Sequence, residues 1–181
     1  MTWLALLIGP VGLIYTAAYM HEKKNAVPGL PVTVAPSMSE KIYQAAVTLL
    51  GRELYDLMTP SVPASEGCAA SVSYVLKEAG CNVPMGGLLT VNTLIEWLVA
   101  HGQEVTEKEA VPGCIITAHS PDVTDPQWAH TGVVAKTGVI SNTSFPVAGF
   151  KAGEWAENYS GDNFQKSFKK QGSIIRYFIV Q

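Results

Sequence analysis

The spacing of apolar positions divides the chain into a helical first half and a second half with the alternation of β-strands. Between residues 39 and 101, apolar side chains recur every three or four positions in three stretches. That period is typical of helices with one buried face. It predicts helices over about 39–54, 68–79 and 91–101. Gly80 and Gly102 follow the last two stretches, as glycine commonly does after a helix.

After residue 112 the apolar period shortens to two, which is the period of a half-buried strand. The pattern predicts strands over 114–118, 129–136, 139–143 and 173–180, with a tight turn at Thr137-Gly138 between the second and third. Helices that precede a run of strands are typical of an α+β domain. We therefore expect helices packed on an antiparallel sheet.

The first twenty residues carry no charged side chain, and about 20 apolar residues suffice for a helix to cross a bilayer. We expect an uncleaved hydrophobic anchor over 1–22, a proline-containing linker over 23–37 and the folded domain over 38–181. A cleaved signal and a buried or virion-packed segment stay open. The expected location is the membrane or the cell envelope. Lys23 and Lys24 favour keeping that end in the cytoplasm, so the orientation also stays open.

Composition argues against a nucleic-acid partner, and the number of cysteines limits how many of them can be paired in disulfides. The net charge is −3 and charged residues make up 15% of the chain. No basic stripe is visible, so we expect no nucleic-acid partner. The three cysteines do not form an even disulfide framework. One reactive thiol and two buried ones fit the count, although a disulfide between Cys81 and Cys114 stays open for an exported domain.

Cys68 is the residue with the clearest chemical signal, because it lies at the predicted start of the second helix. The free N–H groups of a helix start favour negative charge, which lowers the pKa of a thiol and activates it. The same groups can bind the oxyanion formed when a thiolate attacks an amide. We expect Gly67 to leave room for the substrate, and Ser71 to be one of the small residues that keep the helix start open.

A thiol nucleophile needs a base, and His130 at the start of a predicted strand is the strongest candidate. The hairpin brings the strand that ends near Asn142 back beside it. We therefore expect Asn142 to accept the second imidazole N–H, with Ser141 and Ser144 as alternatives for that role. Trp128 is expected to line the substrate groove, although a core position stays open for it.

These motifs together resemble the CHAP and NlpC branch of the papain-like peptidoglycan hydrolases. The matching segments are 67–76, 112–113, 130–134 and 140–142, in an order and spacing that agree from about residue 39 to 145. The resemblance implies a papain-like fold and cleavage of a peptide or amide bond in the bacterial cell wall. It also implies the roles of nucleophile, base and orienting residue for Cys68, His130 and Asn142.

Two positions depart from the family pattern, which often has aspartate where this chain has Gly67 and Cys114. They leave open which branch the chain resembles and hence which bond is cut. The apolar N-terminal segment resembles the signal-arrest-release anchors of some phage lysins. Peptidoglycan is therefore the expected substrate, with a membrane as the second partner.

Three alternatives are weighed against this hypothesis. His119, Asp122, Asp125 and His130 lie close in sequence, but their spacing matches no metal motif, and we expect neither a metal nor another cofactor. The same thiol could transfer an acyl group between lipids, as in some relatives of this fold. The chain could also be a non-catalytic membrane or virion structural protein.

Overall fold

A six-stranded antiparallel sheet with helices on both faces organises the chain in this computed structural model, which describes residues 35–121, 129–145 and 149–181. Pro36–Gln181 forms a compact unit. The expected α+β class is therefore confirmed. The predicted anchor over 1–22 and most of the predicted linker lie outside the described residues. Within the described part, no helix is both long and apolar enough to cross a membrane.

The three predicted helices form, and a fourth follows later in the chain. Their bounds are α2 Met38–Thr48, α3 Cys68–Glu78, α4 Val91–His101 and α5 Gly161–Lys169. Short 3-10 turns cover Ala64–Glu66 and Glu107–Glu109. Helix α2 ends six residues earlier than the apolar period predicted, because the chain turns at Gly51, whose φ of +79° is easily adopted only by glycine.

The sheet contains the four predicted strands and two others, in the spatial order β1-β6-β2-β3-β4-β5. Its strands are β1 Gly102–Val105, β2 Ile115–His119, β3 His130–Val134, β4 Gly138–Asn142, β5 Trp155–Ser160 and β6 Ile174–Val180. Every neighbouring pair is antiparallel. The hairpin predicted at Thr137-Gly138 joins β3 to β4.

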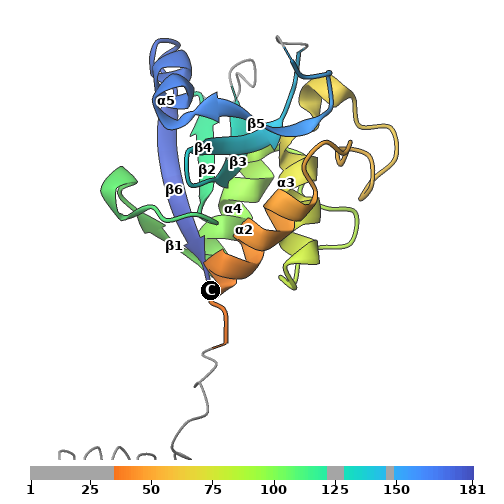
Figure 1. Cartoon of the computed structure of the whole chain (residues 1–181), viewed down its shortest axis with the longest axis horizontal. Helices are drawn as coiled ribbons and strands as arrows, with labels where there is room; N and C mark the ends of the chain where they lie inside the picture. Colours follow the sequence, from red (N-terminus) through yellow and green to blue (C-terminus); the bar gives the residue numbers. More distant parts are fainter. Residues whose placement is uncertain (1–34, 122–128, 146–148) are drawn as a thin grey trace, which may run out of the picture. The chain divides into compact units, whose positions relative to one another are not determined.

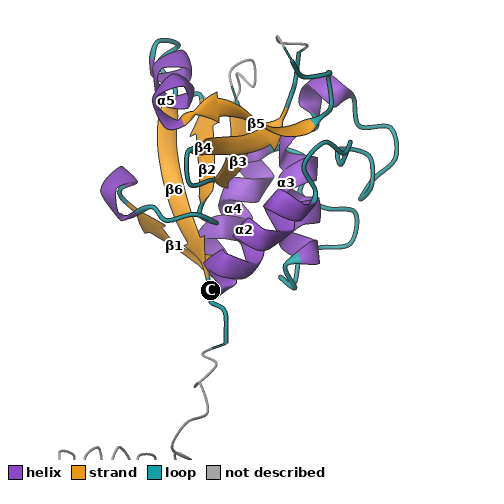
Figure 2. Ribbon diagram, in the orientation of Figure 1, coloured by secondary structure: helices purple, strands orange, loops and turns teal. Residues whose placement is uncertain are grey.

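Helices α2, α3 and α4 lie on one side of the sheet and α5 lies on the other (Figure 1; Figure 2). We call these sides the helix face and the α5 face. Ile115, Val133 and Ile140 pack into the larger core on the helix face. Ile116 and Val139 pack with Phe164 of α5 in a smaller core on the α5 face. Because strand side chains alternate, neighbouring residues point to opposite faces.

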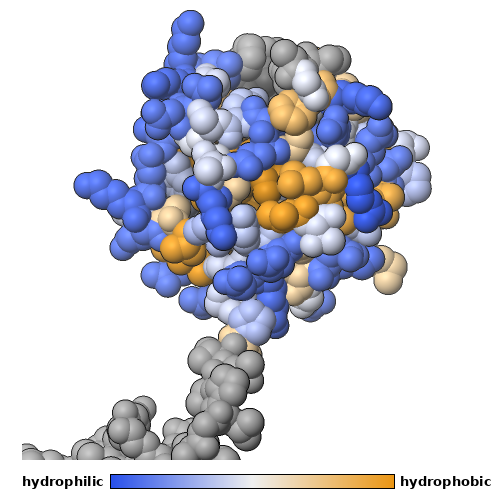
Figure 3. All heavy atoms as spheres, viewed as in Figure 1, coloured by the Kyte–Doolittle hydropathy of each residue, from blue (hydrophilic) through white to orange (hydrophobic). Residues whose placement is uncertain are grey.

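The elements that the apolar pattern missed are the most polar ones. Strand β1 lies at an edge of the sheet and carries Gln103 and Glu104, which are exposed. Helix α5 is mostly polar, and only a narrow stripe containing Phe164 and Phe168 is buried. A short edge strand and a helix with a narrow apolar stripe give little periodic signal, so their tertiary neighbours decide their structure. The face seen in Figure 3 is likewise mostly hydrophilic around a limited apolar area.

Candidate active site

Cys68 is the first residue of α3, as the sequence predicted, and its N-cap Gly67 offers no side-chain hydrogen bond to the helix start. Backbone N–H groups of Ala69, Thr131 and Cys68 itself lie at the sulfur and favour the thiolate. Burial acts more strongly in the opposite direction, because the side chain is only 6% exposed. The pKa of the Cys68 thiol is raised to about 11 as a result. The resting sulfur is therefore a neutral thiol at pH 7.

The thiol lies where β3 and β4 separate. Val134 N–H donates to the Cys114 carbonyl on the β2 side of β3. Since backbone groups alternate along a strand, the N–H of Thr131 points to the other side, toward β4. The β3–β4 ladder begins only at Gly132, opposite Ser141. The sulfur thus lies at the open end of this ladder, beside a backbone N–H that β4 does not use.

His130 begins β3, as predicted, and its ring lies among the aromatic side chains of the α5 face. The ring centroid is 5.6 Å from that of Phe168, in a stacked arrangement, and 5.7 Å from that of Tyr159. The imidazole is 5% exposed. Burial disfavours its charged form and lowers the pKa of His130 to about 4. The resting imidazole is therefore neutral, as a general base must be.

A chain of hydrogen bonds fixes which imidazole nitrogen carries the proton. Asn158 Nδ2 donates to Thr143 Oγ1 over 2.9 Å, which orients the amide. The Ser141 hydroxyl donates to Asn158 Oδ1 over 2.7 Å. Ser141 Oγ lies 3.0 Å from His130 Nε2, and because its own proton is already engaged, it accepts from Nε2–H. The unprotonated nitrogen, which can act as a base, is then Nδ1.

The predicted contact between Asn142 and His130 is absent, and Ser141 takes its place. Asn142 Nδ2 donates to the Ala64 carbonyl over 2.7 Å, and its Oδ1 lies 3.5 Å from the Ser71 hydroxyl. Ser141 points to the α5 face with His130, so the alternation of β4 turns Asn142 to the helix face. Asn142 ties the segment before α3 to the sheet. Sequence reasoning missed Asn158, because no periodic signal predicted β5.

Thr131 is the common neighbour of the two reactive groups. The sulfur lies at its N–H, and the imidazole belongs to the residue before it. Tyr159 is near both groups: its ring faces His130, and burial and then the Cys68 charge raise the pKa of its hydroxyl. The described residues contain no hydrogen bond between Cys68 and His130. The structure therefore brings the two groups to one end of the β3–β4 pair without joining them.

The other predicted substrate contacts have different surroundings. A Cβ added to Gly67 would lie 2.1 Å from Tyr55 Cβ, so this glycine makes room for Tyr55 and not for a substrate. Ser71 is fully buried, and its hydroxyl lies 3.5 Å from Asn142 Oδ1. Trp128 lies outside the described residues. Residues 122 and 125 of the acidic and histidine group also lie outside them, and the described residues contain no cluster suited to a metal ion.

The remaining cysteines are free thiols at separate places. Cys81 Sγ lies 3.5 Å from Met38 Sδ, and Cys114 Sγ accepts from the Val111 N–H over 3.2 Å. The possible disulfide between Cys81 and Cys114 is therefore not formed. Of the three cysteines, Cys68 is the one whose sulfur lies both at a helix start and at the N–H of a strand residue.

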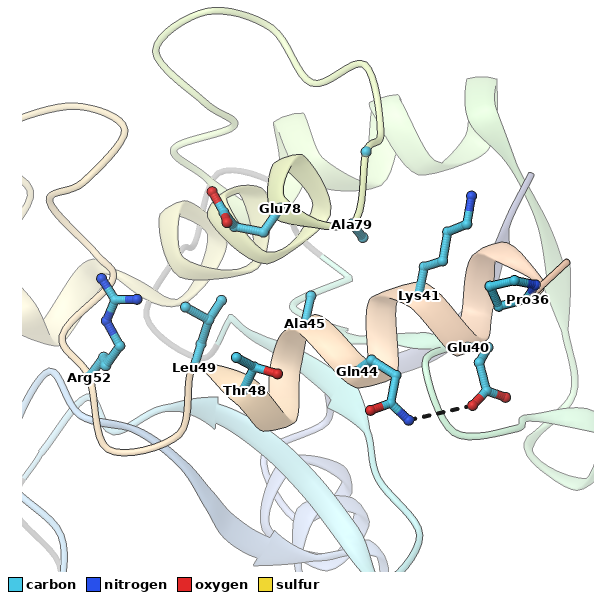
Figure 4. A pocket seen from close by; sticks show the side chains of 11 residues that line it. Pro36, Glu40, Lys41, Gln44, Ala45, Thr48, Leu49, Arg52, Glu78 and Ala79 are labelled. Carbon is cyan, nitrogen blue, oxygen red and sulfur yellow. Dashed lines mark hydrogen bonds between the residues drawn. The ribbon is translucent and has the colours of Figure 1, made fainter.

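A groove of about 650 Å³ lies away from this site, between α2 and the end of α3 (Figure 4). Its lining mixes both charge signs, with Glu40, Lys41 and Arg52 among its residues. It reaches Glu78 at the far end of α3, which is about 15 Å from Cys68 at 1.5 Å per residue. This groove is therefore separate from the candidate active site.

Two comparisons with known proteins identified no relative of the chain. No protein-family model matches the chain, and a search of curated proteins found no match. The proposed chemistry therefore depends on the residues themselves. They are the Cys68 thiol at a helix start, the neutral imidazole of His130, and the hydrogen-bonded residues Ser141 and Asn158 that hold this imidazole.

Proposed function

We propose that the protein is a peptidoglycan hydrolase that cleaves a peptide or amide bond of the bacterial cell wall with Cys68 as nucleophile and His130 as base. The observation that carries this proposal is that the Thr131 N–H lies at the Cys68 sulfur, while the preceding residue, His130, is held by the ordered chain His130–Ser141–Asn158. A thiol, an imidazole with a fixed tautomer and convergent N–H groups are the components of acyl transfer. The sequence resemblance to the CHAP and NlpC hydrolases is the basis for proposing a papain-like fold and this substrate class.

The reaction follows from where each proton can go. His130 Nδ1 takes the proton of the Cys68 thiol, and the sulfur attacks the amide carbonyl. The N–H groups of Ala69 and Thr131, which lie at the sulfur, are the proposed donors to the oxyanion. Collapse of the tetrahedral intermediate breaks the C–N bond, and the imidazolium protonates the leaving amine. Water, deprotonated by His130, then cleaves the thioester and restores the thiol.

The buried resting state requires an activation step within this mechanism. The pKa of Cys68 is raised to about 11 and that of His130 is lowered to about 4. A pre-formed thiolate–imidazolium pair would need the opposite order of these values. The proton therefore moves only when a substrate carbonyl lies at the sulfur. Because the imidazole lies on the α5 face and α3 packs on the helix face, the ring must leave its aromatic neighbours and swing around the start of β3 to reach the thiol. General-base catalysis is thus proposed in place of a standing ion pair.

The test uses the full-length protein and purified cell-wall material, with release of soluble fragments as the measurement. Cys68→Ala should abolish release, because no other group replaces the sulfur. Cys81→Ala is the matched control: Cys81 is half-buried and free and follows the end of α3 opposite to Cys68, and this variant should retain activity. Full activity in Cys68→Ala would end the proposal.

The apolar segment Met1–Met20 favours a second candidate, acyl transfer between lipids through the same thiol. Both activities form a thioester on Cys68, but with different acyl groups. Mass spectrometry of trapped protein separates them: a muropeptide adduct supports hydrolysis of the wall, and a fatty-acyl adduct supports the lipid reaction. The absence of either acyl adduct on Cys68 would instead favour the non-catalytic structural protein.

The same segment is the basis for placing the protein at the membrane or in the cell envelope. A variant with Leu6→Lys and Leu7→Lys interrupts the apolar run. We expect the original chain to sediment with membranes and this variant to lose that association. Equal sedimentation of both would contradict membrane anchoring by this segment.

A further inference from the structure

We infer that Phe168 of α5 is a positioning residue of the proposed reaction: its ring holds the His130 imidazole at rest on the α5 face and limits how often the imidazole reaches the Cys68 thiol. This inference rests on the proposed function, because it takes Cys68 and His130 as the reacting groups. It also gives a role to α5, the helix on the opposite side of the sheet from the other three (Figure 1).

The imidazole belongs to a closed group of four rings, which we call the aromatic cluster: His130, Tyr159, Phe164 and Phe168. Every pair of these rings is in contact, with centroids between 4.7 and 6.1 Å apart. Phe168 lies closest to the imidazole, at 5.6 Å, and its plane is only 13° from that of the imidazole. Tyr159 and Phe164 are tilted by 58° and 32°. Phe168 is therefore the ring stacked on the imidazole face.

Helix α5 is attached to the sheet largely through this cluster. Its buried residues are Phe164, Gln165 and Phe168, and two of the three are rings of the cluster. Gln165 is held separately, by a hydrogen bond from its Nε2 to the Tyr177 hydroxyl over 2.6 Å. The contacts that fasten α5 are thus largely the ones that hold the imidazole, so the two are expected to loosen together.

The start of β3 is open for the movement of the imidazole once it is released. Pairing of β3 with β4 begins at Gly132, so no residue of β4 is paired with His130. The Cys68 sulfur lies at the N–H of the next residue, Thr131. Ser141 acts differently from Phe168, because it contacts Nε2 and fixes which nitrogen carries the proton. Phe168 has no polar atom and acts only through the position of the ring.

The reactivity of the thiol reports where the imidazole is, without any cell-wall substrate. Burial holds the pKa of Cys68 at about 11, so little thiolate is present at pH 7. An imidazole beside the thiol takes its proton and raises the fraction of thiolate, which is the form that alkylating agents attack. Release of His130 should therefore be seen as faster alkylation of Cys68.

The test measures iodoacetamide labelling of Cys68 in full-length protein at pH 7, resolved from the other two free cysteines by peptide mass spectrometry. Phe168→Leu keeps an apolar side chain and removes the ring. We expect its Cys68 to be labelled about tenfold faster than in the parent, as for a thiol pKa lowered by one unit. Phe168→Tyr keeps the ring and should be labelled at the parent rate.

Phe178→Leu is the matched control for the loss of a buried ring. Phe178 is fully buried on β6, and its ring contact is with Arg176 and not with the aromatic cluster. This control should be labelled at the parent rate. Thermal unfolding checks that each variant folds, and Phe168→Met takes the place of Phe168→Leu if leucine prevents folding.

A double variant separates positioning from a general loosening of the fold. With His130→Gln added to Phe168→Leu, the faster labelling should disappear, because no imidazole is left to take the thiol proton. Faster labelling that persists in the double variant, or no gain in Phe168→Leu, would overturn the inference even if the parent cleaves cell-wall material. A gain that requires His130 would support it even if the parent releases no wall fragments, a result that would end only the proposed hydrolase.

Discussion

Ser141 and Asn142 are adjacent in sequence and face opposite sides of the sheet, so they are expected to have separable roles. Ser141 holds the imidazole through Nε2, whereas Asn142 holds the segment before α3 through the Ala64 carbonyl. The difference can be measured, because one residue contacts the proposed base and the other contacts only the scaffold.

Ser141→Ala should lower kcat by about 10- to 100-fold, a part of the roughly 10²–10⁴ that a positioned base contributes. The imidazole would lose the acceptor that keeps the proton on Nε2. Ser141→Thr retains the hydroxyl and should restore much of the rate. The measurement is kcat across pH, because losing the acceptor at Nε2 changes the pKa of the imidazole and moves the acidic limb of the profile, whereas a packing defect does not.

Asn142→Ala is the paired comparison and should act on stability. It leaves the Ala64 carbonyl without its donor, which costs about 1–3 kcal/mol of unfolding free energy. Denaturant unfolding measures this loss, and the kcat of the folded enzyme should stay within a few-fold of the parent. If Asn142→Ala greatly lowered kcat and Ser141→Ala left it unchanged, the orienting role would belong to Asn142.

At the scale of elements, the start of α3 is placed by a close contact between the loop before it and the segment after α2. Gly67 packs directly against Tyr55. Asn142 and the Ala64–Glu66 turn add a polar attachment to β4. The position of the thiol therefore depends on the loop before α3, the segment after α2 and the distant strand β4.

Gly67→Ala should destabilise the protein by about 1–3 kcal/mol, because the new methyl group would meet Tyr55 Cβ at 2.1 Å. Gly161→Ala is the matched control, since a Cβ at the start of α5 meets nothing within 4 Å. Thermal unfolding of the two variants gives the comparison. A loss in Gly161→Ala as large as in Gly67→Ala would show that the contact with Tyr55 is not the cause.

At the scale of the whole molecule, the two buried reactive groups make stability depend on pH in two windows. Folding lowers the pKa of His130 from its ordinary value of 6.5 to about 4, so the unfolded chain takes up the proton first. Stability is therefore lost as pH falls from about 6.5 toward 4. The pKa of Cys68 is raised from 9.0 to about 11 by folding, so stability is lost as pH rises between these values.

We expect each full window to cost about 3 kcal/mol, since a tenfold difference in proton affinity is worth about 1.4 kcal/mol. Denaturant unfolding at pH 7, 4.5 and 10.5 measures the profile. Since other groups titrate there too, the informative quantity is the difference from a variant. His130→Gln should reduce the loss of unfolding free energy on the acid side of the profile alone. Cys68→Ala should reduce the loss on the alkaline side alone. Slopes unchanged in both variants would contradict the burial of these groups.

Several features of the site could be read from local sequence. Helical periodicity and a preceding glycine placed Cys68 at a helix start, and alternation placed His130 at the start of a strand. The turn at Thr137-Gly138 indicated that β4 returns beside β3. These signals are local, because they depend on side chains within a few residues of one another.

Which side chain completes the site was decided only by the tertiary structure. A shift of one residue exchanges the two faces of a strand, so sequence could not choose between Ser141 and Asn142. Asn158 comes from β5, a strand that only its neighbours define. The burial that keeps the thiol and imidazole neutral also arises from distant elements, notably α5 and β5. Sequence by itself thus determined the candidate nucleophile and base, while packing between layers determined their partners and their charge.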